Sequence, residues 1–130
     1  MLKVSQNADC GNSPKNRLAA NTEIALARGD TAFLREVLSS DVRWQIIGEP
    51  VREGREEVIQ ALIQRARNED IREIIIAHAI SHGKNGAVNG SMTRADGTRV
   101  DFCTFFTFSN AKGSAIRAIE HYAIPGPKPT

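Results

Sequence analysis

Residues 100–108 read Val-Asp-Phe-Cys-Thr-Phe-Phe-Thr-Phe, and this stretch decides the fold. Because side chains in a strand point alternately to the two faces of a sheet, its apolar residues divide into two sets. One face carries Phe102, Thr104, Phe106 and Phe108. The opposite face carries Cys103, Phe105 and Thr107. Both faces are apolar enough to be covered, so we expect helices on one side of the sheet and a second subunit on the other.

Turn signals on either side of this strand predict an antiparallel meander. Asn85-Gly86 and Asp96-Gly97 are hairpin dipeptides, because a type I′ turn needs positive φ at both central residues. With a further turn at 110–113, these signals separate four expected strands. The strands are expected over 71–83, 87–94, 98–109 and 114–124.

The first half of the chain has helical periodicity instead. Apolar spacing and end signals predict helices over 13–28, 30–38 and 55–68. Alternation predicts a strand over 42–46, with a short return strand over 51–54. Helices that precede a run of strands are typical of the α+β class.

Length and composition are typical of one ordinary domain. The chain has 130 residues, of which 41% are hydrophobic and 25% charged. We expect a flexible leader over 1–12, a single domain over 13–124 and a flexible tail over 125–130. A net charge of +2 argues against a nucleic-acid binder, which normally has a concentrated basic face.

The sequence predicts neither a membrane segment nor a cofactor. No apolar run approaches the roughly 20 residues that span a bilayer. Cys10 and Cys103 are the two cysteines, and they have neither metal-site spacing nor a disulfide framework. We therefore expect no metal, no cofactor and a cytoplasmic location.

Four segments in a set order carry a resemblance to a known family. They are Ala-Leu-Ala-Arg-Gly-Asp-Thr-Ala-Phe-Leu at 25–34, Ser-Asp-Val-Arg-Trp-Gln-Ile at 40–46, Val-Arg-Glu-Gly-Arg-Glu-Glu-Val-Ile at 51–59 and Ile-Arg-Ala-Ile-Glu-His-Tyr at 116–122. Together they resemble the SnoaL-like bacterial branch of the nuclear transport factor 2-like superfamily, which is related to polyketide cyclases and ketosteroid isomerases. The resemblance implies a cystatin-like cone, in which a bent antiparallel sheet wraps around three N-terminal helices. It also implies a pocket at the open end and a homodimer through the outer face.

The superfamily contains enzymes and non-enzymes, so the resemblance leaves the activity open. An alignment on Gly29-Asp30 and 106–108 puts Ile46 at the carboxylate base of the ketosteroid isomerases. It puts Thr22 and Thr104 at their two hydrogen-bond donors. Because isoleucine cannot accept a proton, we do not expect that chemistry.

Two other chemistries of the family can be compared with the chain. Its epoxide hydrolases need an Asp-Arg-Asp triad, for which Asp101 and Arg117 are the nearest candidates, without a second pocket aspartate. Scytalone dehydratase-like enzymes use paired histidines with a carboxylate and tyrosines. This comparison stays open, on the following residues: His78, His82, Glu120, His121 and Tyr122.

Alternation in the last strand places Glu120 on the pocket face, with Arg117 and His121 on the other. A carboxylate in an apolar pocket would have a raised pKa and could serve as acid or base. The candidate catalytic residues are Glu120, His78 and Tyr122. The candidate ligand-binding residues are Trp44, Leu62, Met92, Thr104, Phe106, Glu120 and Tyr122.

Plainer interpretations stand beside these assignments. Glu120 fits a solvated or arginine-paired position at a sheet edge, and His78 and His82 fit a dimer face or a strand end. Asn89 either orients a ligand or lies at the sheet edge, and Gly90 either leaves space in the pocket wall or marks a bulge.

Three functions remain open on the sequence. The first is binding of a small apolar molecule in the cone. The alternative is an isomerase, cyclase or dehydratase that uses Glu120 with a histidine for proton transfer. The third is a dimerisation module without a ligand.

Overall fold

The sheet has the strand order β1-β4-β5-β6-β7-β2-β3 in the computed structural model, which describes residues 2–7 and 13–127. The helices are α1 (Pro14–Arg28), α2 (Thr31–Val37) and α3 (Arg55–Glu69). The strands are β1 (Lys3–Gln6), β2 (Leu38–Ile46), β3 (Arg52–Glu53), β4 (Ile71–His82), β5 (Asn85–Arg94), β6 (Arg99–Phe108) and β7 (Ile116–Pro125). Strands β4 to β7 form the predicted antiparallel meander. The α+β class and the curled sheet around three helices are confirmed.

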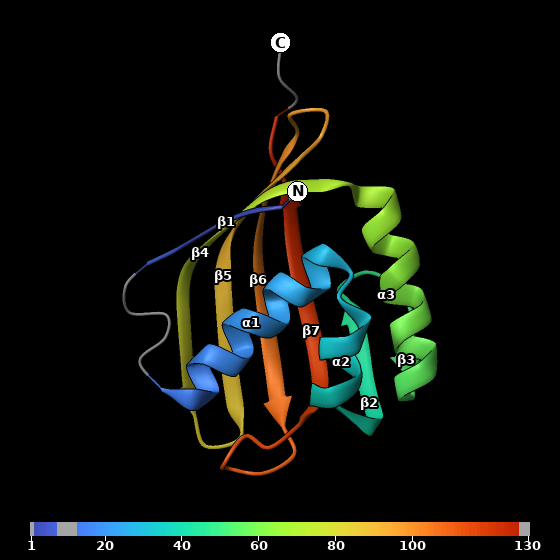
Figure 1. Ribbon diagram of the computed structural model, residues 1–130, viewed down its shortest axis with the longest axis vertical. Coiled ribbons are helices and arrows are strands. Elements are labelled where there is room, and N and C mark those ends of the chain that lie inside the picture. The colour runs from blue at the N-terminus through green and yellow to red at the C-terminus, as the bar shows by residue number, and fades with distance from the viewer. Residues whose placement is uncertain (1, 8–12, 128–130) are drawn as a thin grey trace.

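All three helices lie on the concave side of the sheet (Figure 1). Helix α1 crosses β4 and β5, and α3 packs on β2. The Ser13 hydroxyl accepts a hydrogen bond from the Asn16 amide at 3.1 Å, so it caps α1 as the sequence predicts. Gly29 ends that helix with a left-handed φ of 74°, and Asp30 caps α2.

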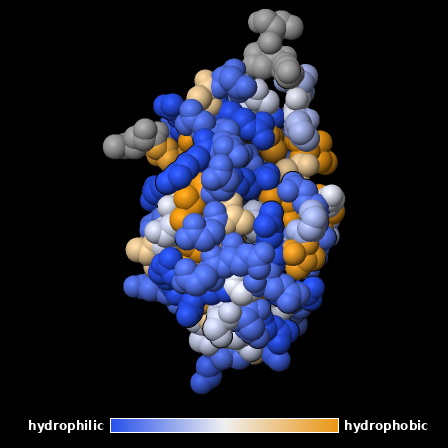
Figure 2. Space-filling model, turned by 90° about the vertical axis from the view of Figure 1, so that its right-hand side faces the viewer, coloured by the Kyte–Doolittle hydropathy of each residue, from blue (hydrophilic) through white to orange (hydrophobic). Residues whose placement is uncertain are grey.

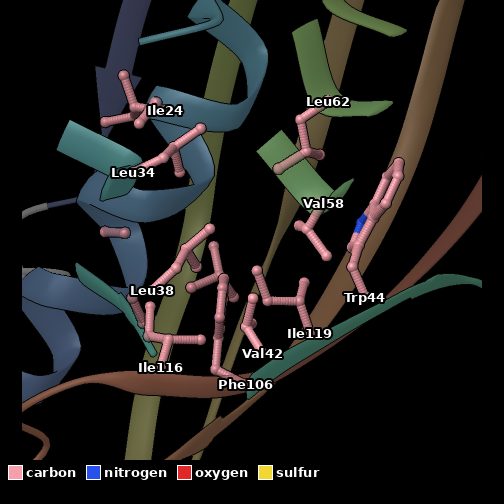
Figure 3. Close-up of a cluster of buried hydrophobic side chains, with 14 of the residues drawn as sticks. Ile24, Leu34, Leu38, Val42, Trp44, Val58, Leu62, Phe106, Ile116 and Ile119 are labelled. Atoms are coloured by element: carbon pink, nitrogen blue, oxygen red, sulfur yellow. The ribbon is translucent and has the colours of Figure 1, made fainter. Parts of the chain in front are cut away.

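The core lies between these helices and the inner face of the sheet (Figure 3). Phe102, Thr104, Phe106 and Phe108 are all buried, so the face predicted from alternation in β6 is confirmed. The opposite face of the same strand is open, and Phe105 is 49% exposed there.

Three features of the chain's local structure differ from the expectations. Within the expected leader, Lys3–Gln6 form β1, which pairs in parallel with β4, while residues 1 and 8–12 lie outside the described residues. The first hairpin turns at Gly83-Lys84, where Gly83 has a φ of 58°, and Asn85 already belongs to β5. Of the expected tail, Pro125 ends β7, and residues 128–130 lie outside the described part.

Strand β7 contains a bulge at Arg117. Ile116 pairs with Phe108, but Ala118 pairs with Thr107, the next residue of β6, so Arg117 is an extra residue. From that point on, Ile119, His121 and Ala123 face inward. The prediction that Glu120 and Tyr122 share the inner face with Ile116 is therefore wrong.

A second irregularity lies where β4 approaches Gly90. The pairing of β4 with β5 slips between Ile76 and His78. A Cβ on Gly90 would lie 1.8 Å from the Ile75 carbonyl oxygen. Of the two interpretations of Gly90, the structure supports the bulge.

Across residues 2–7 and 13–127, none of the helices has the length and apolar character needed to cross a membrane.

Candidate functional site

A cavity lies inside the cone, between α1, α3 and the inner face of the sheet. Its walls come from both helices and from strands β2, β4, β5, β6 and β7. Apolar side chains that line it include Leu26, Trp44, Leu62, Ile71, Met92 and Val100. Its volume, about 60 Å³, holds several water molecules or the end of a small organic molecule.

Glu23 of α1 lines this cavity and is only 1% exposed. It follows Ala19 and Ala20 by one helical turn, so it lies on the buried face of α1. Its Oε1 atom has no hydrogen-bond partner within the described residues. Burial raises the pKa of Glu23 to about 7, and a hydrogen bond with Thr104 acts in the opposite direction. The carboxyl therefore exchanges its proton near neutral pH.

His121 of β7 lines the same cavity. Its Nδ1 atom lies 2.8 Å from Oγ1 of Thr104, and its ring stacks on Phe102 with 5.9 Å between centroids. Burial, together with a smaller effect of the Arg65 charge, lowers the pKa of His121 to about 4. The imidazole is therefore neutral at neutral pH, with Nε2 left for a ligand.

Thr104 joins these two groups in the order Glu23, Thr104, His121. A hydroxyl has a single hydrogen, so Thr104 donates to one neighbour at a time. When it donates to an ionised Glu23, Nδ1 of His121 must donate to Thr104, and Nε2 is an acceptor. When Glu23 is protonated, it donates to Thr104, and Thr104 donates to Nδ1 of His121. Nε2 then carries the ring hydrogen. The protonation state of Glu23 thus decides whether His121 presents a base or an acid.

An ion cluster forms the open side of the cavity. Nη2 of Arg65 lies 2.6 Å from Oε1 of Glu69, and Nη2 of Arg94 lies 3.2 Å from Oε2 of the same carboxylate. The three side chains are 18% to 32% exposed. Glu49 adds a longer contact to Arg65 at 3.8 Å. Two cations therefore share one partly buried carboxylate beside the cavity.

The curled sheet around three helices agrees with the family that the sequence resembles. The family model for the SnoaL-like domain matches residues 19–117. The chain belongs to the SnoaL-like domain family. A search of curated proteins found no match for this SnoaL-like chain.

Solved structures share this SnoaL-like fold at low identity. A protein of unknown function from Cytophaga hutchinsonii, described as NTF2-like, has a TM-score of 0.66 at 19% identity, over 83% of this chain and 97% of that chain. A candidate ketosteroid isomerase from Kribbella flavida has a TM-score of 0.69 at 16% identity, over 88% and 80%. SalBIII, an epoxide hydrolase/cyclase-like enzyme in polyether salinomycin pyran ring formation, has a TM-score of 0.64 at 17% identity, over 88% and 93%. At these identities the likeness establishes the fold alone.

Several sequence-predicted ligand residues do meet in the SnoaL-like cone. Trp44, Leu62 and Met92 line the cavity, and Thr104 lies behind its wall as the partner of His121. Figure 3 shows Trp44 of β2 and Leu62 of α3 on the same side of the core. Phe106 is 1% exposed and belongs to the packed core, so it does not line the cavity.

The expected catalytic residues do not lie in the cavity. Glu120 and Tyr122 are exposed on the outer face of β7, where the Tyr122 ring meets the edge of Phe105. His78 is exposed on β4, and its Nδ1 lies 2.9 Å from Oδ1 of Asn89. Asn89 thus orients a histidine on the outer face of the SnoaL-like sheet.

The residues that were compared with the isomerases and the epoxide hydrolases have the following positions in the structure. Ile46, at the position of the isomerase base, is buried. Asp101 is exposed and paired with Arg99, and Arg117 is exposed at the bulge. In the part of the chain that the structure describes, no group of three or more His, Cys, Asp or Glu side chains could hold a metal ion.

Sequence reasoning did not single out Glu23, Arg65, Glu69 or Arg94, and it placed His121 on the face away from the cavity. For Glu23 a signal existed, because it follows Ala19 by four residues and Ala20 by three, on the small-residue face of α1. For His121 the alternation pattern pointed the wrong way, because the bulge at Arg117 changes its phase.

Proposed function

We propose that the cavity binds a small, largely apolar molecule, and that Glu23 and His121 move a proton to or from it. The observation that carries this proposal is Oε1 of Glu23, which lacks a partner among the described residues and lies in the wall of a cavity that His121 also lines. Leaving a buried polar atom without a partner costs roughly 1–3 kcal/mol. A ligand that hydrogen-bonds to Glu23 would offset that cost.

The proton path follows from the hydrogen bonds. Starting with Glu23 ionised, Nε2 of His121 takes a proton from a C–H or O–H bond of the ligand. The Nδ1 hydrogen moves to Thr104, and the hydroxyl hydrogen of Thr104 moves to Glu23. The ligand keeps the electron pair of the broken bond, and returning the proton to another ligand atom completes an isomerisation. A pKa near 7 suits Glu23 to both steps.

Isomerase, cyclase and dehydratase reactions all need such a transfer. The descriptions of two similar structures, a candidate ketosteroid isomerase and an epoxide hydrolase/cyclase-like enzyme, support this reaction class. The second candidate function is ligand binding without turnover, which the apolar cavity walls favour. Replacing Glu23 by glutamine separates the two, because binding survives this change and proton transfer does not.

The single tryptophan makes ligand binding measurable, because Trp44 lines the cavity. Small cyclic ketones are titrated while Trp44 fluorescence is followed, and exchange of their α-protons in D₂O is followed by NMR. We expect saturable quenching, and exchange faster than in buffer that is lost in Glu23→Gln.

Two variants on β7 control for binding elsewhere. Ala123→Leu fills the cavity wall and should abolish quenching, whereas Ala118→Leu faces outward and should not. Quenching without exchange would leave the binding function alone. Neither quenching nor exchange with any ketone would overturn the proposal.

We also propose that a second copy of the chain covers the outer face of the sheet. This face exposes large apolar side chains on three strands of the meander, β4, β6 and β7. They include Ile80 (63%), Phe105 (49%), Tyr122 (42%) and Ile124 (73%). An apolar face of this kind is typical of an interaction surface.

A further inference from the structure

We infer that the ligand of this cavity is a small carboxylic acid with an apolar body, whose carboxylate is held by Arg65 and Arg94. The inference rests on the proposed binding cavity and names the chemical class of its ligand.

The two guanidinium groups have more donors than their present partner uses. Each guanidinium has five N–H donors in a planar fork that matches a carboxylate. Glu69 is approached by Nη2 of Arg65 and by Nη2 of Arg94, and the remaining cluster contact is the 3.8 Å approach of Arg65 to Glu49. Among residues 2–7 and 13–127, donors are therefore left on both arginines, which line the cavity.

The charges of the cavity also favour an anion. Its titratable lining groups are Glu23, Arg65, Glu69, Arg94 and His121. With Glu23 protonated and His121 neutral, two positive charges face one negative charge. Arg65 also lowers the pKa of His121, which lines the same cavity.

Glu69 itself occupies an unfavourable place for a carboxylate. It is the last residue of α3, where the negative end of the helix dipole repels an anion. Its contacts with both arginines compensate, and they hold the two guanidinium groups close to one carboxylate. A ligand carboxylate would share these cations with Glu69.

A groove on the surface is lined by the same arginine. A larger groove, of about 510 Å³, shares Trp44, Arg65 and Glu69 with the cavity. It lies between α3 and strands β2 and β3, on the side of the molecule where the surface is mostly hydrophilic (Figure 2). The acid would enter with its apolar body against Trp44 and Leu62, and its carboxylate would stay at the open side.

A matched pair of probes tests the inference. Cyclohexanecarboxylate and cyclohexanecarboxamide have nearly the same shape and differ in charge. Both are titrated at pH 6.5 against Trp44 fluorescence, with calorimetry as a second readout. We expect the acid to bind at least about tenfold more tightly than the amide. The preference should fall severalfold when the salt concentration rises from 50 mM to 500 mM.

Three charge variants assign the preference to the cluster. Arg94→Gln should reduce the preference for the acid towards one, and Arg65→Gln serves the same purpose if Arg94→Gln does not fold. Glu69→Gln should strengthen acid binding, because it removes the competing carboxylate. Arg99→Gln makes the same charge change at an exposed residue outside the cavity lining and should leave the preference unaltered.

The outcomes separate this inference from the proposed function. If the acid and the amide bind equally, or if the preference survives in both arginine variants, the inference is wrong. If small ketones bind and the acid does not, the inference is wrong while the proposed function stands. If no probe quenches Trp44, both fail together.

Discussion

Oγ1 of Thr104 lies 2.8 Å from Nδ1 of His121, so a hydroxyl in the middle of β6 connects the histidine of β7 to the buried carboxyl of α1. Each member of this series is largely withdrawn from solvent. Their titrations therefore affect both stability and the proposed chemistry. As pH rises, the titrations of Glu23 and His121 change the stability in opposite directions.

Glu23→Gln should change the pH dependence of stability. The folded pKa of Glu23, about 7, is above its value of 4.5 in an unfolded chain, so the folded state binds more protons between these values. Stability from this group is full below pH 4.5 and is lost as pH rises through 7, by about 3 kcal/mol. Urea unfolding at pH 5, 6, 7 and 8 should show that the glutamine variant becomes more stable relative to the wild type as pH rises. Parallel curves for the two proteins would contradict the buried, protonated state.

His121→Gln should have the opposite effect. The folded pKa of His121, about 4, is below its usual 6.5, so the unfolded state binds more protons between these values. Its contribution rises with pH across this window, and it nearly cancels that of Glu23 in the wild type. The variant should therefore lose stability as pH rises from 5 to 7. Urea unfolding of the double variant with Glu23→Gln is the control, and its stability should be flat in this range.

Thr104→Val keeps the shape of the threonine and removes its hydroxyl. We expect a loss of about 1–3 kcal/mol in the free energy of unfolding, because two buried partners lose a hydrogen bond. Because that bond lowers the pKa of Glu23, the pKa should rise further in the variant. NMR titration of a ¹³C-labelled Glu23 carboxyl measures this rise directly. Thr104→Ser retains the hydroxyl, and a rise of equal size in that variant would rule out the hydrogen bond as the cause.

Phe105→Glu should convert the proposed dimer into a monomer. A charge in the middle of the apolar outer face would be buried without a partner on association. Sedimentation velocity at several protein concentrations measures the change. Val51→Glu is a matched control, since Val51 is 39% exposed and lies outside the meander. A wild-type chain that stays monomeric at about 100 μM would contradict the proposed interface.

The helices were predictable because their ends have local chemistry. Ser13, Gly29 and Asp30 act within a few residues of sequence, and each has the predicted role in the structure. The inner face of β6 was predictable for a similar reason, because nothing interrupts its alternation from Val100 to Phe108.

The residues proposed for proton transfer were less predictable because their positions depend on distant parts of the chain. The parallel pairing of β1 with β4 joins residues about 70 apart and has no turn signal between them. The burial of Glu23 depends on the strands that α1 crosses. The inward position of His121 depends on an extra residue at Arg117, which composition and spacing do not reveal.

The bulge at Arg117 also bears on how relatives of this protein are aligned. If Arg117 were deleted, Ile116 and Ala118 would become neighbours opposite Phe108 and Thr107, and His121 would still face the cavity. A relative one residue shorter in β7 can therefore place the same side chain at the same site. An ungapped alignment of the two chains would instead match His121 with the column of an outward-facing residue. In this family, a gap placed at the bulge decides which columns describe the cavity.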